Sequence, residues 1–324
     1  MNRRHLVTLA FALGVSQLAT AQPATYPSHA LTYVVAYTPG SANDILVRIV
    51  APALGRELGQ TIVVDNKPGA GGTLGTALVA KAKPDGYTLG LGSTATVAIN
   101  RALFARLNYD PLNDFTPVIA FATTPNVLVV PASSPVKTVA ELKRAAAARS
   151  LNYSSPGIGT TQHLAGVLLE RHLPAGAAVH VPFKGPAEQV TAIASGQVDF
   201  GFVSLPSGLA LIRDGRLRAL GITPLEPIAA LPGVPSLASA GLSGFDGAGV
   251  WFGLVVPAGT PDAVVNRLHA ASTQVLAQPE VQAKLAAAGY EPAAPASRES
   301  FDRFVHEQVR FWEELVRRSG ATAD

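Results

Sequence analysis

The sequence contains no cysteine among its 324 residues, and only 15% of its residues are charged. The missing cysteines exclude disulfides, thiol catalysis and cysteine-ligated metal sites. Lys and Arg are never clustered with interleaved aromatic residues, so the sequence does not indicate a nucleic acid partner. Beyond the first 21 residues, no stretch is long and apolar enough to predict a membrane-spanning helix.

The N-terminus has the pattern of a secretory signal peptide. Arg3 and Arg4 precede an apolar run at residues 6–15, and small residues lead up to Ala21. We expect cleavage after Ala21 and a periplasmic location. The removed segment holds two of the positive charges and no acidic residue, so the formal net charge falls from +3 to +1 (3 − 2).

Short apolar runs alternate with helical patterns along the remaining chain, which is typical of an α/β protein with mainly parallel sheets. One predicted helix covers residues 42–58, and Pro52 is expected to kink or break it. A chain of about 300 residues is long enough for two domains. The predicted strands cover residues 31–36, 61–64, 87–91, 126–130, 151–154, 179–183, 198–203, 218–222 and 249–256.

Five loops rich in Gly, Ser or Thr each connect a predicted strand to a predicted helix. A helix N-terminus offers unpaired N–H groups and a partial positive charge, both of which favour an anion. If the loops converge, they form a site for a carboxylate. The alternative for each single loop is an ordinary turn with a helix cap. The loops lie at residues 40–43, 69–73, 92–96, 159–161 and 184–186.

Cofactor and catalytic motifs are missing. The run from Gly69 to Gly75 resembles a dinucleotide fingerprint, but Leu74 stands where the third glycine belongs, so we expect no cofactor. The spacing of the histidines suits no standard metal site, and His180 is expected at the surface. His163 either points a ring N–H into a cleft or only packs against neighbouring side chains. A hydrolase or isomerase that pairs His163 with the hydroxyl of Ser155 or Thr160 remains an alternative.

Ordered motifs across residues 26–324 make the chain similar to the periplasmic solute-binding proteins of tripartite tricarboxylate transporters, also called Bug proteins. The resemblance implies an α/β fold of two lobes, of the type II-like periplasmic binding protein class. Each lobe is then a mixed, mainly parallel sheet flanked by helices, with the ligand cleft between the lobes. The matching motifs include TPGSAND at residues 38–44, VDNKPGAGG at 64–72, KPDGYTL at 83–89, VPFKG at 181–185 and GQVD at 196–199.

The resemblance also implies domains, partners and a site. Lobe 1 would comprise residues 26–123 and 248–324, and lobe 2 residues 124–247. We expect a monomer that binds a small carboxylate, docks transiently on a membrane permease and is not an enzyme. A ligand-sensing partner of a signalling system remains an alternative. The residues carried over as ligand-binding are Tyr37, Pro39, Gly40, Ser41, Ala42, Asn43, Ala70, Thr94, Gly159, Thr160, Thr161, His163, Lys184 and Ser204.

Two positions depart from the family pattern. Ser41 stands where members usually have a second glycine; it adds a hydroxyl and restricts the backbone. Members commonly carry an acid after the strand that follows the GQVD motif, where this chain has Val203 and Ser204. An acid there would pair with a ligand ammonium, so its absence favours an organic acid over an amino acid.

Overall fold

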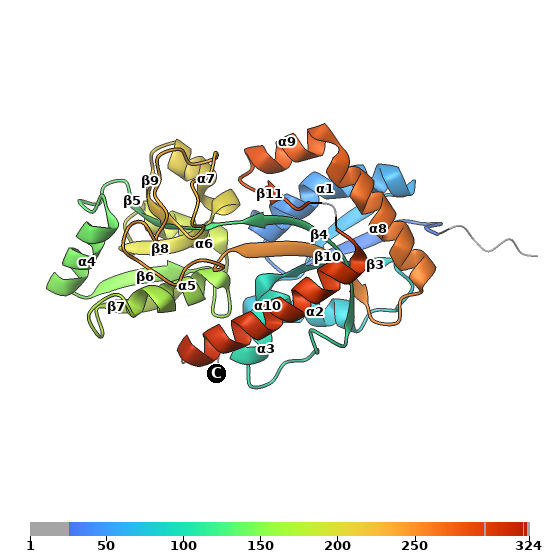
Figure 1. The fold of residues 1–324 in the computed structure, drawn as a ribbon, viewed down its shortest axis with the longest axis horizontal. Helices are drawn as coiled ribbons and strands as arrows, with labels where there is room; N and C mark the ends of the chain where they lie inside the picture. The colour runs from blue at the N-terminus through green and yellow to red at the C-terminus, as the bar shows by residue number, and fades with distance from the viewer. Residues whose placement is uncertain (1–25, 295, 320, 323–324) are drawn as a thin grey trace, which may run out of the picture.

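Two mixed β-sheets, each flanked by helices, lie side by side in the computed structural model (Figure 1). The structure describes residues 26–294, 296–319 and 321–322, so the predicted signal peptide lies outside the described residues. The α/β class and the two-sheet architecture are confirmed. Strands of the first sheet come from residues 31–124 and 250–292, and those of the second from residues 126–222. The domain boundaries drawn from the sequence remain a proposal.

The first sheet has the strand order β11-β4-β10-β3-β1-β2. Alternate side chains of β1 reach opposite faces, because successive residues of a strand point to opposite sides. Tyr33 packs with α1, α8 and α9 on one face, and Val34 packs with α2 on the other. The elements are β1 (Leu31–Val35), α1 (Ala42–Leu58), β2 (Ile62–Asn66), η1 (Ala70–Gly72), α2 (Thr73–Ala80), β3 (Thr88–Ser93), η2 (Thr94–Ile99), α3 (Asn100–Leu103), β4 (Phe115–Thr124), β10 (Val250–Pro257), α8 (Asp262–Ala277), α9 (Pro279–Ala287), β11 (Glu291–Pro292) and α10 (Arg298–Ser319).

The second sheet has the order β7-β6-β8-β5-β9. Strand β5, which lies between β8 and β9, is buried on both sides, with Leu128 facing α4 and α5, and Val127 facing α6 and α7. Helices therefore cover both faces of each sheet. The elements are β5 (Asn126–Pro131), α4 (Val139–Ala148), β6 (Leu151–Ser155), α5 (Thr161–Glu170), β7 (Ala178–Pro182), α6 (Pro186–Ala194), β8 (Phe200–Ser204), α7 (Leu205–Arg213) and β9 (Leu217–Ile222).

Both sheets are mixed, as expected, but the expectation that each is mainly parallel is wrong, because antiparallel pairs make up three of the five in the first sheet and two of the four in the second. Strands β1, β2 and β3 pair in parallel, as do β6, β7 and β8, while the pairs made by β4, β5, β9, β10 and β11 with their neighbours are antiparallel. The antiparallel strands include those next to the crossings between the sheets. Only Pro125 separates β4 from β5, and residues 223–249 lead back to β10.

Asn126 ties these crossing segments together. Its side-chain amide donates to the carbonyl of Ala248 at 2.7 Å, and its backbone N–H donates to the hydroxyl of Thr223 at 3.1 Å. The side chain is fully buried. Burial makes each of these hydrogen bonds costly to lose, so Asn126 fixes the start of the second sheet relative to the returning chain.

Two helices show how packing decides what local sequence leaves open. Helix α1 continues through Pro52, so the expected break is wrong; Ala51, Ala53 and Leu54 on either side are buried and hold the helix to the first sheet. The long C-terminal α10 runs from the first half of the molecule to below α5 of the second half in the view of Figure 1. Its Trp312 packs with Leu164 of α5. None of the helices in the described part of the chain is long and apolar enough to span a bilayer.

Candidate functional site

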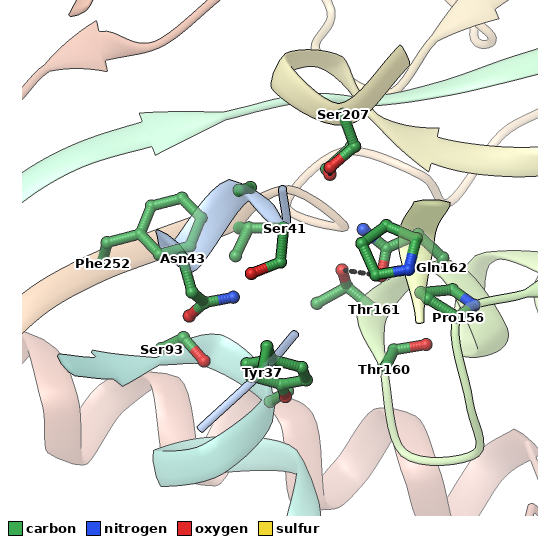
Figure 2. A pocket seen from close by; sticks show the side chains of 15 residues that line it. Tyr37, Ser41, Asn43, Ser93, Pro156, Thr160, Thr161, Gln162, Ser207 and Phe252 are labelled. Atoms are coloured by element: carbon green, nitrogen blue, oxygen red, sulfur yellow. Dashed lines mark hydrogen bonds between the residues drawn. The ribbon is translucent and has the colours of Figure 1, made fainter. Parts of the chain in front are cut away.

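A narrow cavity lies where both sheets present helix N-termini (Figure 2). Ser41 and Asn43 come from the start of α1, Thr160 and Gln162 from the start of α5, and Ser207 from the first turn of α7. The lining residues are Tyr37, Ser41, Ala42, Asn43, Ser93, Ala95, Pro156, Thr160, Thr161, Gln162, Pro186, Ser204, Ser207, Val250 and Phe252.

Half of the residues carried over from the family line this cavity. These are Tyr37, Ser41, Ala42, Asn43, Thr160, Thr161 and Ser204. The other seven do not line it, namely Pro39, Gly40, Ala70, Thr94, Gly159, His163 and Lys184. The two loops expected to hold the ligand therefore do come together, but only some of the expected residues in each loop line the cavity.

Asp44 holds the first loop in place from behind. Its carboxylate accepts hydrogen bonds from the backbone N–H of Gly40 at 3.0 Å, the Arg48 guanidinium at 2.9 Å and the Asn66 amide at 3.0 Å. Burial acts to raise the pKa of Asp44, but the bonds from Arg48, Gly40 and Asn66 outweigh it and keep that pKa below its usual value. Asn66 also donates to the carbonyl of Tyr37 at 3.0 Å, which fixes both ends of the loop.

Each of the two main loops ends in a helix cap. Ser41 is the N-cap of α1, and its hydroxyl accepts from the Asp44 N–H at 3.2 Å. Its extended backbone, with φ −70°, is unstrained, so serine replaces the family's glycine here without cost. Thr160 caps α5 in the same way, accepting from the His163 N–H at 3.2 Å and donating to Gly157 O at 2.7 Å.

The two halves of the molecule touch beside the cavity. The Ser207 hydroxyl lies 3.5 Å from the carbonyl oxygen of Gly40. A Cβ atom on Gly185 would lie 2.5 Å from the hydroxyl of Thr38, and one on Gly71 would lie 2.7 Å from the carbonyl oxygen of Ile158. These close approaches leave no room for side chains, so glycine permits the halves to meet.

Four of the expected site residues lie outside the cavity lining. Thr94 is fully buried, and its hydroxyl accepts the backbone N–H of Trp251 at 2.9 Å, which joins η2 to β10. Lys184 is exposed outside the cavity, and its backbone N–H bonds Glu188. Ala70 is exposed and has φ +44°. Gly159, with φ +86°, turns the second loop where a Cβ would meet the Asn100 side chain at 2.9 Å.

His163 packs against His180 outside the cavity, with ring centroids 4.6 Å apart. The side chain of His163 is 7% exposed, and among the described residues its Nδ1 has no hydrogen-bond partner. Burial, with a smaller contribution from nearby His180, lowers the pKa of His163 to about 4. Simple packing, the second of the two sequence interpretations, therefore describes His163.

The expectation of a surface position for His180 is wrong. His180 is half-buried, stacks on Tyr153, and its Nε2 lies 2.7 Å from the Ser155 hydroxyl. Burial lowers the pKa of His180 to about 4. Within the described residues no carboxylate bonds this ring, so it lacks the orienting acid of a catalytic triad. Ser155 also bonds the backbone of Gly157, which indicates a structural role in the second loop.

Sequence reasoning missed eight of the lining residues. Ser93, Ala95 and Pro186 lie within two of the five candidate loops, and Gln162 directly follows a third, so counting every residue of these loops and the next helical position would have found them. Val250 and Phe252 are two positions apart on β10 and so share one face of that strand. Nothing in the local sequence ties that face to the loops. The eight are Ser93, Ala95, Pro156, Gln162, Pro186, Ser207, Val250 and Phe252.

The cavity wall carries no Asp, Glu, Lys, Arg or His side chain. Its polar groups are neutral hydroxyls and amides at helix starts, and Phe252, Val250 and Ala95 add apolar surface. A helix N-terminus stabilises an exposed anion by roughly 0.3–1 kcal/mol, and by up to about 2 kcal/mol when partly buried. No group of three or more metal-ligating side chains occurs within residues 26–294, 296–319 and 321–322. The chemistry of the wall therefore suits one small anion held by neutral donors.

Comparisons with known proteins agree with this geometry. The model of the tripartite tricarboxylate transporter family receptor matches residues 46–321. A UPF0065 protein in the tcbD-tcbE intergenic region of Pseudomonas sp. strain P51 is 38% identical, and the match covers 97% of this chain and 93% of the relative's length. Protein BugT of Bordetella pertussis is 32% identical over 92% of this chain and 91% of its own.

Two solved structures extend the likeness to the fold. Rpa4515 of R. palustris, solved with adipate, superposes with a TM-score of 0.87 and 33% identity, over 92% of this chain and 99% of that one. MatC of Rhodopseudomonas palustris, solved with malate, gives a TM-score of 0.84 and 32% identity, over 90% of this chain and 100% of that one.

Proposed function

Because the chain belongs to the tripartite tricarboxylate transporter receptor family, whose members are solute-binding proteins and not enzymes, we propose that it captures a small carboxylate for a tripartite permease. Adipate and malate in the two related structures support a carboxylate ligand. The hydrolase or isomerase alternative is contradicted by this membership. His163, its proposed base, hydrogen-bonds to no hydroxyl through its ring in the described part of the chain.

The observation that carries the proposal is the meeting of the α1 and α5 N-termini across one cavity. Ser41 and Asn43 face Thr160 and Thr161 across it (Figure 2). The two helices come from opposite sheets, so an anion between them gains from both only when the halves are together. Ligand binding then favours the closed arrangement, as in hinge closure.

We favour an organic acid without an amino group. A ligand ammonium would need a carboxylate partner when it leaves water, and the wall offers none. At the position where the family pattern has an acid, Ser204 lines the cavity, and Val203 is buried against Gly208. The absence of an acid at this turn supports the same preference.

Export, docking and domain boundaries belong to the same proposal. The signal-peptide pattern supports cleavage after Ala21 and action in the periplasm, where we expect a monomer that docks transiently on the permease. Lobes of residues 26–123 with 248–324, and of residues 124–247, fit the strand content of the two sheets. Mass spectrometry of the exported protein measures the cleavage point, and a mature mass that begins anywhere but at Gln22 contradicts the predicted site.

Thermal-shift screening tests the capture of a carboxylate. A ligand that binds only the folded protein at 100 times its Kd stabilises it by about 2.7 kcal/mol. We expect a clear rise in Tm with at least one member of a panel of mono-, di- and tricarboxylates, and smaller shifts with the matching amino acids. No stabilisation by any carboxylate in the panel would reject the proposal.

A further inference from the structure

The Asn43 amide is the feature of the cavity that local structure does not explain. Its side chain is 9% exposed, lies in the second position of α1 and borders the cavity (Figure 2). Among the described residues, no hydrogen bond to its amide is found. The neighbouring Ser41 hydroxyl, in contrast, accepts the backbone N–H of Asp44. The amide atoms of Asn43 stay open to the cavity, so they are available to bond a ligand there, and water bonds them when no ligand is bound.

Gln162 provides a similar side-chain amide on the opposite side of the cavity. It is 7% exposed, and its side-chain oxygen accepts from the Thr161 hydroxyl at 3.3 Å, which leaves the amide nitrogen free to bond a ligand. The two amides come from α1 and α5, and hence from opposite sheets. Each offers a donor that carries no formal charge.

Charge decides which ligand these groups suit. One carboxylate between two helix N-termini is stabilised by partial positive charges on both sides. A second carboxylate on a short ligand lies a few ångströms from the first and repels it, and no Lys, Arg or His on the wall offsets that repulsion. An ammonium lacks a carboxylate partner and also faces the positive ends of the helices.

From these observations we propose that the site selects a small monocarboxylate with an uncharged, partly apolar body, and that Asn43 is a residue that determines this selection. The body packs against Phe252 and Val250, and the amides of Asn43 and Gln162 bond its oxygen atoms. This rests on the proposed function and narrows it, since the related structures hold the dicarboxylates adipate and malate.

Matched acids separate the alternatives by isothermal titration calorimetry. Three carbon skeletons are each tested with one carboxylate, with two, and with one carboxylate plus an amine. The series are butyrate, succinate and 4-aminobutyrate; hexanoate, adipate and 6-aminohexanoate; and benzoate, terephthalate and 4-(aminomethyl)benzoate. On the skeleton that binds most tightly, we expect the monocarboxylate to bind at least about tenfold more tightly than its two partners.

The outcomes distinguish the two proposals. A dicarboxylate or an amine that binds as tightly as its monocarboxylate overturns the selection and leaves carboxylate capture in place. No binding in any series, together with no thermal shift across the wider panel, overturns both.

Asn43→Asp tests the role of Asn43 with almost no change in shape. An acid at the second position of a helix is favourable for the helix, so the variant should fold, which circular dichroism checks. We expect the monocarboxylate to bind at least about tenfold more weakly at pH 7.5, because a negative charge now faces its carboxylate. Asn43→Ala, which removes the amide without adding charge, should weaken binding less.

Asn266→Asp is the matched control, since Asn266 is exposed on α8 far along the chain from the loops. It should bind like the parent protein. If Asn43→Asp binds the monocarboxylate as tightly as Asn266→Asp does, Asn43 does not determine selection.

Discussion

The paired rings of His163 and His180 make the stability of this protein depend on pH. Burial, with a contribution from His180, lowers the pKa of His163 to about 4 from the usual 6.5. The unfolded chain therefore takes up a proton at this ring below about pH 6.5, whereas the folded chain does so only near pH 4. The stability contributed by the neutral ring is complete above pH 6.5 and is lost as the pH falls towards 4.

The size of the effect follows from the two pKa values. Between pH 7.5 and pH 5.0, proton uptake by the unfolded state lowers the free energy of unfolding by about 2 kcal/mol for His163 alone. The pKa of His180 shifts in the same direction by burial, but its ring is only half-buried and adds less. The His163 contribution is large against a typical stability of about 5–15 kcal/mol.

Urea unfolding of the parent protein and of His163→Gln, at pH 7.5 and pH 5.0, measures this contribution. Circular dichroism follows the helices, and fluorescence follows Trp251 and Trp312, both buried. The parent should lose about 2 kcal/mol more than the variant on acidification. His306→Gln, which removes an exposed histidine of α10, controls for the substitution. Equal losses in the parent and in His163→Gln would refute the assignment.

Three further substitutions probe the loops and the core. Asp44→Asn weakens three hydrogen bonds to the first loop and should cost about 1–3 kcal/mol in urea unfolding; an unchanged midpoint would show that the network is dispensable. Gly185→Ala pushes against Thr38 and should weaken the binding of whichever acid binds, while Thr38→Ala in the same chain restores it; failure of that rescue would contradict the contact. Gly166→Ala places a Cβ 2.2 Å from the Tyr153 ring and should cost about 1–3 kcal/mol, which a parent-like Tm would exclude.

Local sequence was enough to place the helix starts that carry the site. Ser41 and Thr160 cap their helices through hydroxyls three residues upstream of the N–H groups that they accept, a contact that spacing alone predicts. Buried strands such as β1 and β5 appear as short apolar runs, since both of their faces are covered. Strand β4 was not predicted, because Pro117 and a run of small residues give it no clear period.

Residues far apart in the chain could not be assigned by the same means. Thr94 follows a strand in a Gly-rich loop like the other candidates, yet its hydroxyl bonds Trp251, 157 residues away. His180 was expected at the surface because it lies near the end of a short strand, but α5 brings His163 against it. Pro52 lowers the intrinsic preference for a helix, and only burial of its neighbours on the first sheet keeps α1 continuous.

The sequence by itself determined the α/β class, the five candidate loops, the family and the absence of charged groups from the loops at Ser41 and Thr160. The tertiary structure decided which loops share a cavity, because the crossings at Pro125 and after Thr223 set one sheet beside the other. It also brought Phe252 to the wall and turned Lys184 away from it. The physical reason is that caps and turns depend on neighbours within four residues, whereas a cavity depends on how two sheets pack together.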